Sequence, residues 1–245
     1  MKQIKKHTGI IIKISDYTDE AVIADVLEEK GVFGYRIKGT TNPNSKTRCY
    51  ATTLNRISFN ATNDPVLGLM TEVNVDNYYP NIKFDLDKLN ISSIILEKIR
   101  TFATYVKDKK LFYEFACDVF NLLENTKYNY AVLNIFEIKM LYLLGVQPTL
   151  NSCVKCGKKC EGFFVINEGG IVCRECLTGF YDLSINYSNL FRDIYYRKIN
   201  NLDDSFLNRA NTNALSRTID AYYESYLDFK SKSKEIVRKM EQWKE

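Results

Sequence analysis

The sequence predicts an α+β protein of more than one domain: an N-terminal five-stranded OB-fold barrel, followed by an α-helical domain with an inserted four-cysteine zinc ribbon. Three observations predict this fold. Strand-like apolar runs fill the first 79 residues, apolar residues recur at helical spacing after Pro80, and two Cys-x2-Cys pairs interrupt the helical part. We expect the barrel domain over residues 1–79 and the helical domain over 80–245, with the ribbon at about 150–182.

Five β-branched or alternating runs predict the strands of the barrel, and polar turns containing Asn, Asp and Pro separate them. In the fourth run, polar and apolar side chains alternate as they do on a half-buried strand. A β-sandwich or an SH3-like barrel has a similar number of strands, so strand count alone leaves these alternatives open. The expected strands are Thr8–Ser15, Ala21–Leu27, Gly31–Lys38, Arg48–Ala61 and Leu67–Val75.

The period of the apolar residues changes to that of an α-helix after Pro80. The third of these helical segments is apolar on nearly every side, which is typical of a buried central helix, and Gly145 and Pro148 end it. The expected helices are Leu89–Val106, Leu111–Leu123, Tyr130–Leu144, Tyr187–Ile199 and Ala214–Phe229.

Four cysteines carry the clearest chemical signal in the chain. Two Cys-x2-Cys pairs with sixteen intervening residues match the spacing of a zinc ribbon, in which each pair supplies half of a tetrahedral thiolate site. Four thiolates leave no open position for water, so we expect one structural Zn²⁺. Cysteines also serve as core residues or form disulfides, and Cys160 is either a spare thiol or a substitute ligand. The expected ligands are Cys153, Cys156, Cys173 and Cys176.

Composition places the chain among ordinary globular proteins. It has 245 residues, of which 45% are hydrophobic and 26% charged. The sequence contains neither an apolar run of the roughly 20 residues that a membrane span needs nor a secretory signal, so we expect an intracellular, cytoplasmic protein. A single histidine, His7, and the absence of phosphate-binding glycine motifs argue against familiar enzyme mechanisms.

Basic residues are unevenly distributed. From Lys30 to Asn63 there are six basic residues and no acidic ones, which is typical of a surface for a polyanion. Aromatic residues among them, Tyr35, Tyr50 and Phe59, either stack on bases or belong to the core. The candidate DNA-binding residues are Lys13, Arg36, Lys38, Lys46, Arg48 and Arg56. A possible second basic patch comprises Lys230, Lys232, Lys234, Arg238 and Lys239.

The order of these parts resembles the RecO family of DNA repair proteins. Local matches include a glycine-led opening strand followed by Asp-Tyr, a Lys-Gly pair followed by a basic Ser segment, a buried helix leading into the first cysteine pair, and a Lys-Ser pair near the end. They lie at Gly9–Lys13 with Asp16 and Tyr17, Gly31–Gly39, Ser45–Arg48, Phe136–Pro148, Gly169–Gly170, Tyr226–Leu227 and Lys232–Ser233.

The resemblance implies a non-enzymatic recombination mediator in a bacterial, nucleoid-associated setting. Such a protein binds single- and double-stranded DNA and anneals complementary strands. It engages RecR and the tail of the single-strand-binding protein, and it helps RecA load onto coated DNA, with no membrane or small-molecule substrate. Two other hypotheses stay open: a zinc-ribbon adaptor that binds proteins with little DNA affinity, and a zinc enzyme of nucleic-acid processing.

Overall fold

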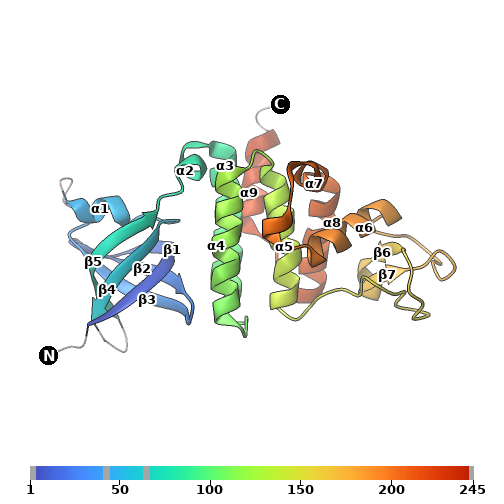
Figure 1. The fold of residues 1–245 in the computed structure, drawn as a ribbon, viewed down its shortest axis with the longest axis horizontal. Coiled ribbons are helices and arrows are strands. Elements are labelled where there is room, and N and C mark those ends of the chain that lie inside the picture. Colours follow the sequence, from blue (N-terminus) through green and yellow to red (C-terminus); the bar gives the residue numbers. More distant parts are fainter. Residues whose placement is uncertain (1–3, 41–44, 63–66, 243–245) are drawn as a thin grey trace. The chain divides into compact units, whose positions relative to one another are not determined.

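The computed structural model describes residues 4–40, 45–62 and 67–242 (Figure 1). The chain divides into two compact units. We call Met1–Phe84 with Lys98–Glu124 the barrel unit, and Asp85–Glu97 with Asn125–Glu245 the ribbon unit. The expected domain boundary at residues 79 and 80 stays a prediction. No helix in the described part of the chain is both long enough and apolar enough to cross a membrane.

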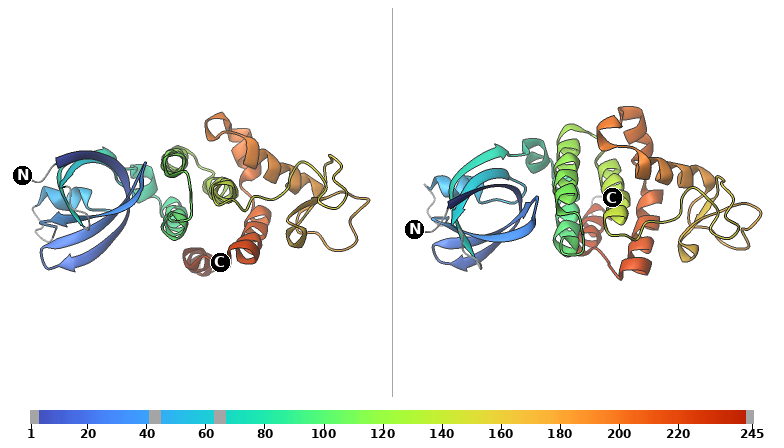
Figure 2. Two further views of the ribbon diagram at one scale, coloured as in Figure 1. Left: turned by 90° about the horizontal axis from the view of Figure 1, so that it is seen from below. Right: turned by 60° about the horizontal axis from the view of Figure 1, so that its bottom comes forward.

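The barrel unit contains the expected closed five-stranded barrel, so this prediction is confirmed. Neighbouring strands run antiparallel except β3 and β5, which pair in parallel, and the ring has the order β1-β2-β3-β5-β4 (Figure 2). Alternate side chains of β4 are buried, which directs them to the interior. The strands are β1 (Ile4–Thr18), β2 (Ala21–Glu28), β3 (Gly31–Lys38), β4 (Arg56–Thr62) and β5 (Gly68–Asn77).

One segment of the barrel differs from the sequence-based expectation. Residues expected to begin the fourth strand form a short helix, α1 (Lys46–Tyr50), and β4 begins only at Arg56. The hydroxyl of Ser45 caps this helix by accepting a hydrogen bond from Thr47 N at 3.2 Å. Local capping therefore overrides the strand tendency of this segment.

Helices complete the barrel unit. The unit contains α2 (Pro80–Phe84), α4 (Lys109–Asn125) and the last residues of α3 (Leu86–Phe102). The Glu124 carboxylate accepts hydrogen bonds from the backbone N–H groups of Asn81 at 2.9 Å and Ile82 at 3.0 Å, which satisfies free donors in the first turn of α2. Arg100 Nη1 donates to Ile12 O of β1 at 2.9 Å. The Glu124 bonds therefore join α4 to α2, and the Arg100 bond joins the end of α3 to the barrel.

The ribbon unit is built around α5 (Asn129–Leu143), which is buried on nearly every side as its apolar sequence predicts. The hydroxyl of Tyr223 donates to Glu137 O in this helix at 2.9 Å. The unit also contains α3 as far as Glu97. Its described residues further form α6 (Ile185–Tyr196), η2 (Ile199–Asn201), α7 (Asp204–Ala210), α8 (Asn213–Leu227) and α9 (Lys232–Gln242).

Between α5 and α6 the chain forms the inserted ribbon, which confirms the predicted architecture. Two short strands, β6 (Phe163–Val165) and β7 (Gly170–Val172), pair antiparallel around η1 (Ile166–Glu168). The Tyr226 hydroxyl of α8 donates to Ile166 O at 2.7 Å, so a hydrogen bond ties the ribbon to the helices of the same unit.

The last helix, α9, is held by carboxylates far away in the sequence. Glu97 accepts hydrogen bonds from the N–H groups of Lys232 at 3.0 Å and Ser233 at 3.2 Å, which caps the start of α9. Inside the unit, Lys234 Nζ lies 2.9 Å from Glu137 and 2.6 Å from Asp220. Because the side chain of Glu137 is fully buried, this ion pair is internal.

Candidate functional site

The four cysteines of the ribbon meet in one cluster. Their Sγ atoms all lie within 4.8 Å of one another, and those of Cys156 and Cys173 are 3.9 Å apart. A tetrahedral site with Zn–S distances near 2.3 Å has sulfur–sulfur edges of about 3.8 Å. A disulfide would need about 2.05 Å. The cluster therefore fits a tetrahedral metal ion.

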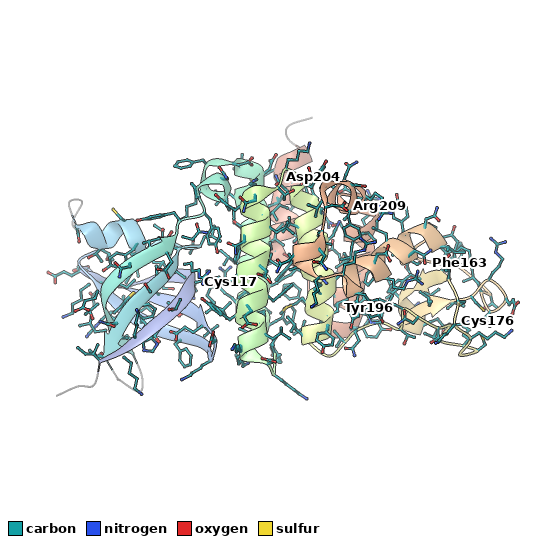
Figure 3. The ribbon with its side chains drawn as sticks, viewed as in Figure 1. Cys117, Phe163, Cys176, Tyr196, Asp204 and Arg209 are labelled. Atoms are coloured by element: carbon teal, nitrogen blue, oxygen red, sulfur yellow. The ribbon has the colours of Figure 1, made fainter. Side chains whose placement is uncertain are left out.

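Tight turns present each pair of thiols. In the first pair, Gly157 has a φ of 73°, a value that favours glycine, and its N–H donates to Cys153 O at 2.8 Å. In the second pair, the N–H of Cys176 donates to Cys173 O at 3.1 Å. Figure 3 shows Cys176 and Phe163 within the ribbon, where β6 and β7 join the two turns. The short hairpin thus brings the two pairs together.

Electrostatics favour a cation in this cluster. Burial opposes ionisation of Cys153, but hydrogen bonds from backbone N–H groups, including those of Cys173 and Cys156, lower its pKa to about 6. Side-chain hydrogen bonds with Cys173 and Cys156 raise the pKa of Cys176 to about 12. Several thiolates within 4.8 Å repel one another, and a divalent ion offsets that repulsion. Thiolate sulfur is also a ligand that zinc prefers. The donor set thus fits Zn²⁺ in both charge and geometry.

Cys160 lies outside this group of four ligand atoms. Its side chain packs against the small core formed by Cys153, Val172 and Cys173. Burial and the neighbouring cysteines raise the pKa of Cys160, so it favours the neutral thiol. Its position agrees with the spare thiol of the sequence analysis.

The predicted DNA-binding residues of the barrel occupy different places. Lys13 on β1 and Lys38 on β3 are exposed, and Arg36 is partly buried two residues before Lys38, on the same face of β3. Lys46 and Arg48 belong to α1, but their side chains lie outside the described residues. Arg56 begins β4 and is close to Tyr113 and Cys117 of α4. The structure thus groups Arg36 with Lys38 and turns Arg56 toward α4.

Acidic side chains from neighbouring strands lie among these cations. In the β1–β2 pairing, Lys13 lies opposite Asp25. On β5, Glu72 accepts a hydrogen bond from Asn60 at 2.5 Å, and Asp76 accepts one from Ser58 at 3.0 Å. A stretch without acids in the sequence therefore becomes a mixed surface in space, because strands far apart in the chain lie side by side.

The possible second patch is largely neutralised. Lys234 is buried against two carboxylates, so its ammonium does not lie on the surface that the sequence suggested. Arg238 pairs with Asp220 at 2.6 Å, and Lys230 pairs with Glu224 at 2.6 Å. Lys232 and Lys239 are exposed and have no carboxylate partner among the residues that the structure describes.

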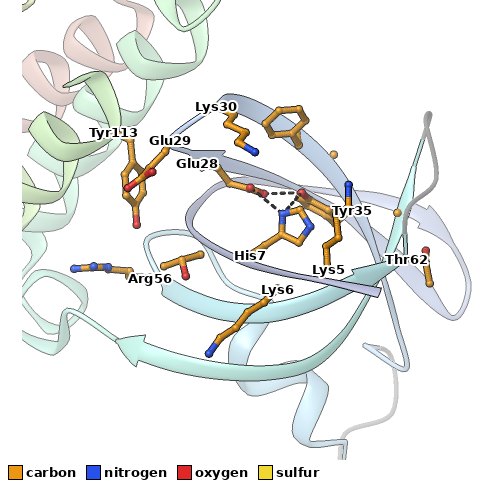
Figure 4. A pocket seen from close by; sticks show the side chains of 14 residues that line it. Lys5, Lys6, His7, Glu28, Glu29, Lys30, Tyr35, Arg56, Thr62 and Tyr113 are labelled. Carbon is orange, nitrogen blue, oxygen red and sulfur yellow. Dashed lines mark hydrogen bonds and ion pairs between the residues drawn. The ribbon is translucent and has the colours of Figure 1, made fainter. Parts of the chain in front are cut away.

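The barrel unit also has an open pocket of about 840 Å³ that the sequence analysis missed (Figure 4). At its base, the His7 ring stacks on Phe59, and its Nδ1 lies 3.0 Å from the Glu28 carboxylate. The Tyr35 hydroxyl donates to the same carboxylate at 2.6 Å. The lining residues are Lys5, Lys6, His7, Thr8, Glu28, Glu29, Lys30, Phe33, Gly34, Tyr35, Arg56, Thr62, Gly68 and Tyr113.

A signal for this pocket was present at the start of the chain. Strand β1 begins at Ile4, four residues before the expected strand, so Lys5 and His7 share one face of it. If the alternation of inward and outward side chains in this strand is continued back to Lys5, His7 falls on the same face as the residues that point into the barrel. The partners Glu28 and Tyr113 could not be found this way, because they come from β2 and α4.

Comparisons with known proteins give a consistent result. A family model described as Recombination protein O C terminal matches residues 83–235. The DNA repair protein RecO of Bacillus subtilis (strain 168) is 26% identical over 246 residues, which cover 98% of this chain and 96% of that protein. The DNA repair protein RecO of Bacillus velezensis is 27% identical with the same coverage. That of Listeria monocytogenes serotype 4a is 22% identical.

Proposed function

The chain belongs to the RecO family, and from that premise we propose that it is a non-enzymatic, DNA-binding mediator of recombination in DNA repair. In this role it binds single- and double-stranded DNA in the bacterial cytoplasm, at the nucleoid, and anneals complementary strands. With RecR, it helps RecA load onto DNA coated with single-strand-binding protein, whose tail it also engages. The similarity to curated DNA repair proteins over 98% of the chain carries this proposal.

The cations of the barrel support DNA binding by residues 1–79. Arg36 and Lys38 share the outer face of β3, and Lys13 is exposed on β1. Lysine and arginine neutralise phosphates and release counterions, so affinity falls as salt rises. Neutralising two strands also lowers their mutual repulsion, which favours annealing without a catalytic group. Lys46, Arg48 and Arg56 are also assigned to DNA binding in this proposal, with Arg56 acting from its position next to α4.

We assign the metal a structural role. One Zn²⁺ bound by Cys153, Cys156, Cys173 and Cys176 would hold the ribbon of about residues 150–182 within the helical domain proposed for residues 80–245. A site closed by four thiolates offers no position for a reacting water, which argues against the zinc-enzyme hypothesis.

An annealing assay tests the proposed function. Complementary strands coated with single-strand-binding protein are mixed with the protein, with and without RecR, at two ionic strengths. We expect ATP-independent annealing that weakens at the higher ionic strength. Failure to anneal even bare strands at low salt would contradict the proposal.

One observation favours a second candidate, the zinc-ribbon adaptor. Asp25, Glu72 and Asp76 lie among the cations of the barrel, and carboxylates neutralise three cations of the second patch. An adaptor would bind protein partners but bind DNA more weakly than the micromolar range. Measuring both affinities under one set of conditions separates the two functions.

A further inference from the structure

The pocket of the barrel unit has the size and setting of a ligand site. Its volume of about 840 Å³ lies within the range of roughly 300–1,000 Å³ typical of small-molecule pockets, which often occupy the mouths of β-barrels. Strands β1 to β5 all contribute lining residues, and α4 contributes Tyr113. A rigid scaffold therefore surrounds the pocket.

The charge of the pocket favours an anion. Four cations line it, against the two carboxylates of Glu28 and Glu29. The Glu28 carboxylate is already engaged by Tyr35 and His7. Among the residues that the structure describes, none of the four cations forms an ion pair with a carboxylate. These cations are Lys5, Lys6, Lys30 and Arg56.

Two buried donors line the pocket. The Tyr113 side chain is 6% exposed, and its hydroxyl forms no hydrogen bond of normal length within the described part of the chain. Arg56 Nε forms none there either, although Tyr113, Arg56 and Cys117 lie close enough together to influence one another's pKa values. Burial raises the pKa of Tyr113, so it keeps its proton and remains a neutral donor. Because buried polar groups are nearly always paired, these two donors would be satisfied by an acceptor that a ligand supplies.

Aromatic groups provide a surface for a base. Phe33 lines the pocket and is 42% exposed, although large apolar side chains are usually buried. The His7 ring, packed between Tyr35 and Phe59, also lines the pocket. Figure 4 shows Arg56, Tyr113 and Glu29 on one side of the pocket, Thr62 on the other side, and Lys30, His7 and Tyr35 between them.

We propose that this pocket binds one unpaired nucleotide of a DNA strand, with its phosphate at the cationic donors Arg56 and Tyr113 and its base against Phe33. The inference rests on the proposed DNA-binding function and makes it more specific. A base in a duplex is already stacked and paired, so the pocket would add affinity for single strands alone.

Two substitutions with a matched control test the proposal. Tyr113→Phe removes only the hydroxyl, and Phe33→Ala removes the aromatic face. The control is Tyr105→Phe, because Tyr105 belongs to the same unit, is 73% exposed and does not line the pocket. Thermal unfolding of each variant checks that the fold is intact.

The probe is a thymidine oligonucleotide with one central 2-aminopurine, whose emission changes when the base stacks. Fluorescence anisotropy of a dye-labelled strand measures total binding. For the normal chain and Tyr105→Phe, we expect a saturable emission change. Phe33→Ala should abolish this change, and Tyr113→Phe should weaken single-strand affinity about 5-fold while changing duplex affinity less than about 2-fold.

The outcomes separate this inference from the proposed function. Normal anisotropy binding with an emission change that survives both pocket substitutions would overturn the pocket assignment and leave DNA binding intact. The absence of anisotropy binding by the normal chain would overturn both. Free thymidine 5′-monophosphate forms a second arm: if it competes fully at the strand's own concentration, the pocket takes free nucleotides, and the assignment to a DNA strand is wrong.

Discussion

The barrel unit and the ribbon unit use charge in opposite ways. In the barrel unit, Lys13 and Lys38 extend from strands into solvent, and four cations around the pocket have no carboxylate partner among the described residues. In the ribbon unit, Lys234 is buried between Glu137 and Asp220, and four thiol groups converge on one another. A basic stretch of sequence therefore does not by itself define a cationic surface, because packing can bury one of its lysines against carboxylates.

The largest effect is expected from a substitution in the four-cysteine cluster of the ribbon unit. Cys153→Ser removes one ligand, so we expect the loss of one zinc equivalent per chain. Because the binding energy of structural zinc, about 10–16 kcal/mol in zinc-finger peptides, is coupled to local folding, the ribbon should unfold locally. Metal analysis and hydrogen exchange over residues 150–182 measure this.

The control for the metal centre is Cys49→Ser, because Cys49 is an exposed free thiol in the barrel unit. It should keep its zinc and its exchange protection. A Cys153→Ser protein with a full zinc equivalent and a protected ribbon would contradict the four-thiolate site.

The second effect breaks the internal ion pair. Lys234→Met removes the ammonium group that lies 2.9 Å from the fully buried Glu137 carboxylate, and we expect a loss of about 3–5 kcal/mol in the free energy of unfolding. Urea denaturation of this variant and of Lys239→Met measures the difference. Because Lys239 is an exposed residue of the same helix, its variant should lose less than about 0.5 kcal/mol. Equal losses would show that Lys234 acts only through helix packing.

The third effect compares DNA binding by exposed cations of the barrel unit with DNA binding by exposed cations of the ribbon unit. Arg36→Ala with Lys38→Ala should lower single-strand affinity about 10-fold at low salt and reduce the slope of log affinity against log salt by about 1.4. The comparison pair is Lys232→Ala with Lys239→Ala on α9. If the α9 pair lowers affinity more than the barrel pair does, then the ribbon unit carries the DNA surface.

The smallest effect concerns Lys139, a partly buried lysine that forms no ion pair with a carboxylate among the residues that the structure describes. Lys139 Nζ donates to Tyr195 O at 3.1 Å and to Arg197 O, and burial lowers the pKa of Lys139 to about 8. Between pH 8 and the unfolded value of about 10.5, the unfolded chain binds more protons than the native chain, so this group's contribution to stability rises with pH. We expect this group alone to contribute a rise of about 1 kcal/mol from pH 8 to 9.5, measured as the difference from a variant that lacks the amine.

Lys139→Met removes that titration. Denaturation of the normal chain and the variant at pH 7.5, 8.5 and 9.5 gives the difference. Parallel pH profiles would show that Lys139 does not titrate in this range.

Patterns that act locally predicted most of the fold. Alternation in the strands, the all-round apolar sequence of α5 and the cysteine spacing each depend on neighbouring residues, and the barrel, the central helix and the cysteine cluster are all present. The helix at Lys46–Tyr50 was missed because a Ser45 cap outweighed the strand tendency. Short helices such as α7 carry too few apolar repeats to predict.

The candidate site was less predictable because charge interactions are set by long-range packing. The cation of Lys234 meets a carboxylate 97 residues earlier in the chain, and Asp25 approaches Lys13 only once two strands pair. The pocket required Tyr113 of α4 to meet residues from five strands. Contacts between residues so far apart in the chain leave no local sequence pattern. The sequence therefore indicated which residues are charged, but not which residues pair with them.

The capping of α9 by distant carboxylates has a consequence for synthesis on the ribosome. Glu97 is translated 135 residues before Lys232, whose backbone N–H donates a hydrogen bond to it. Glu137 is translated 97 residues before Lys234, with which it forms an ion pair. Until then, Glu137, whose side chain the folded unit buries completely, lacks the ammonium group of Lys234. The ribbon unit therefore completes its fold only after α9 has been translated, whereas residues up to Glu124 supply everything that the barrel unit contains.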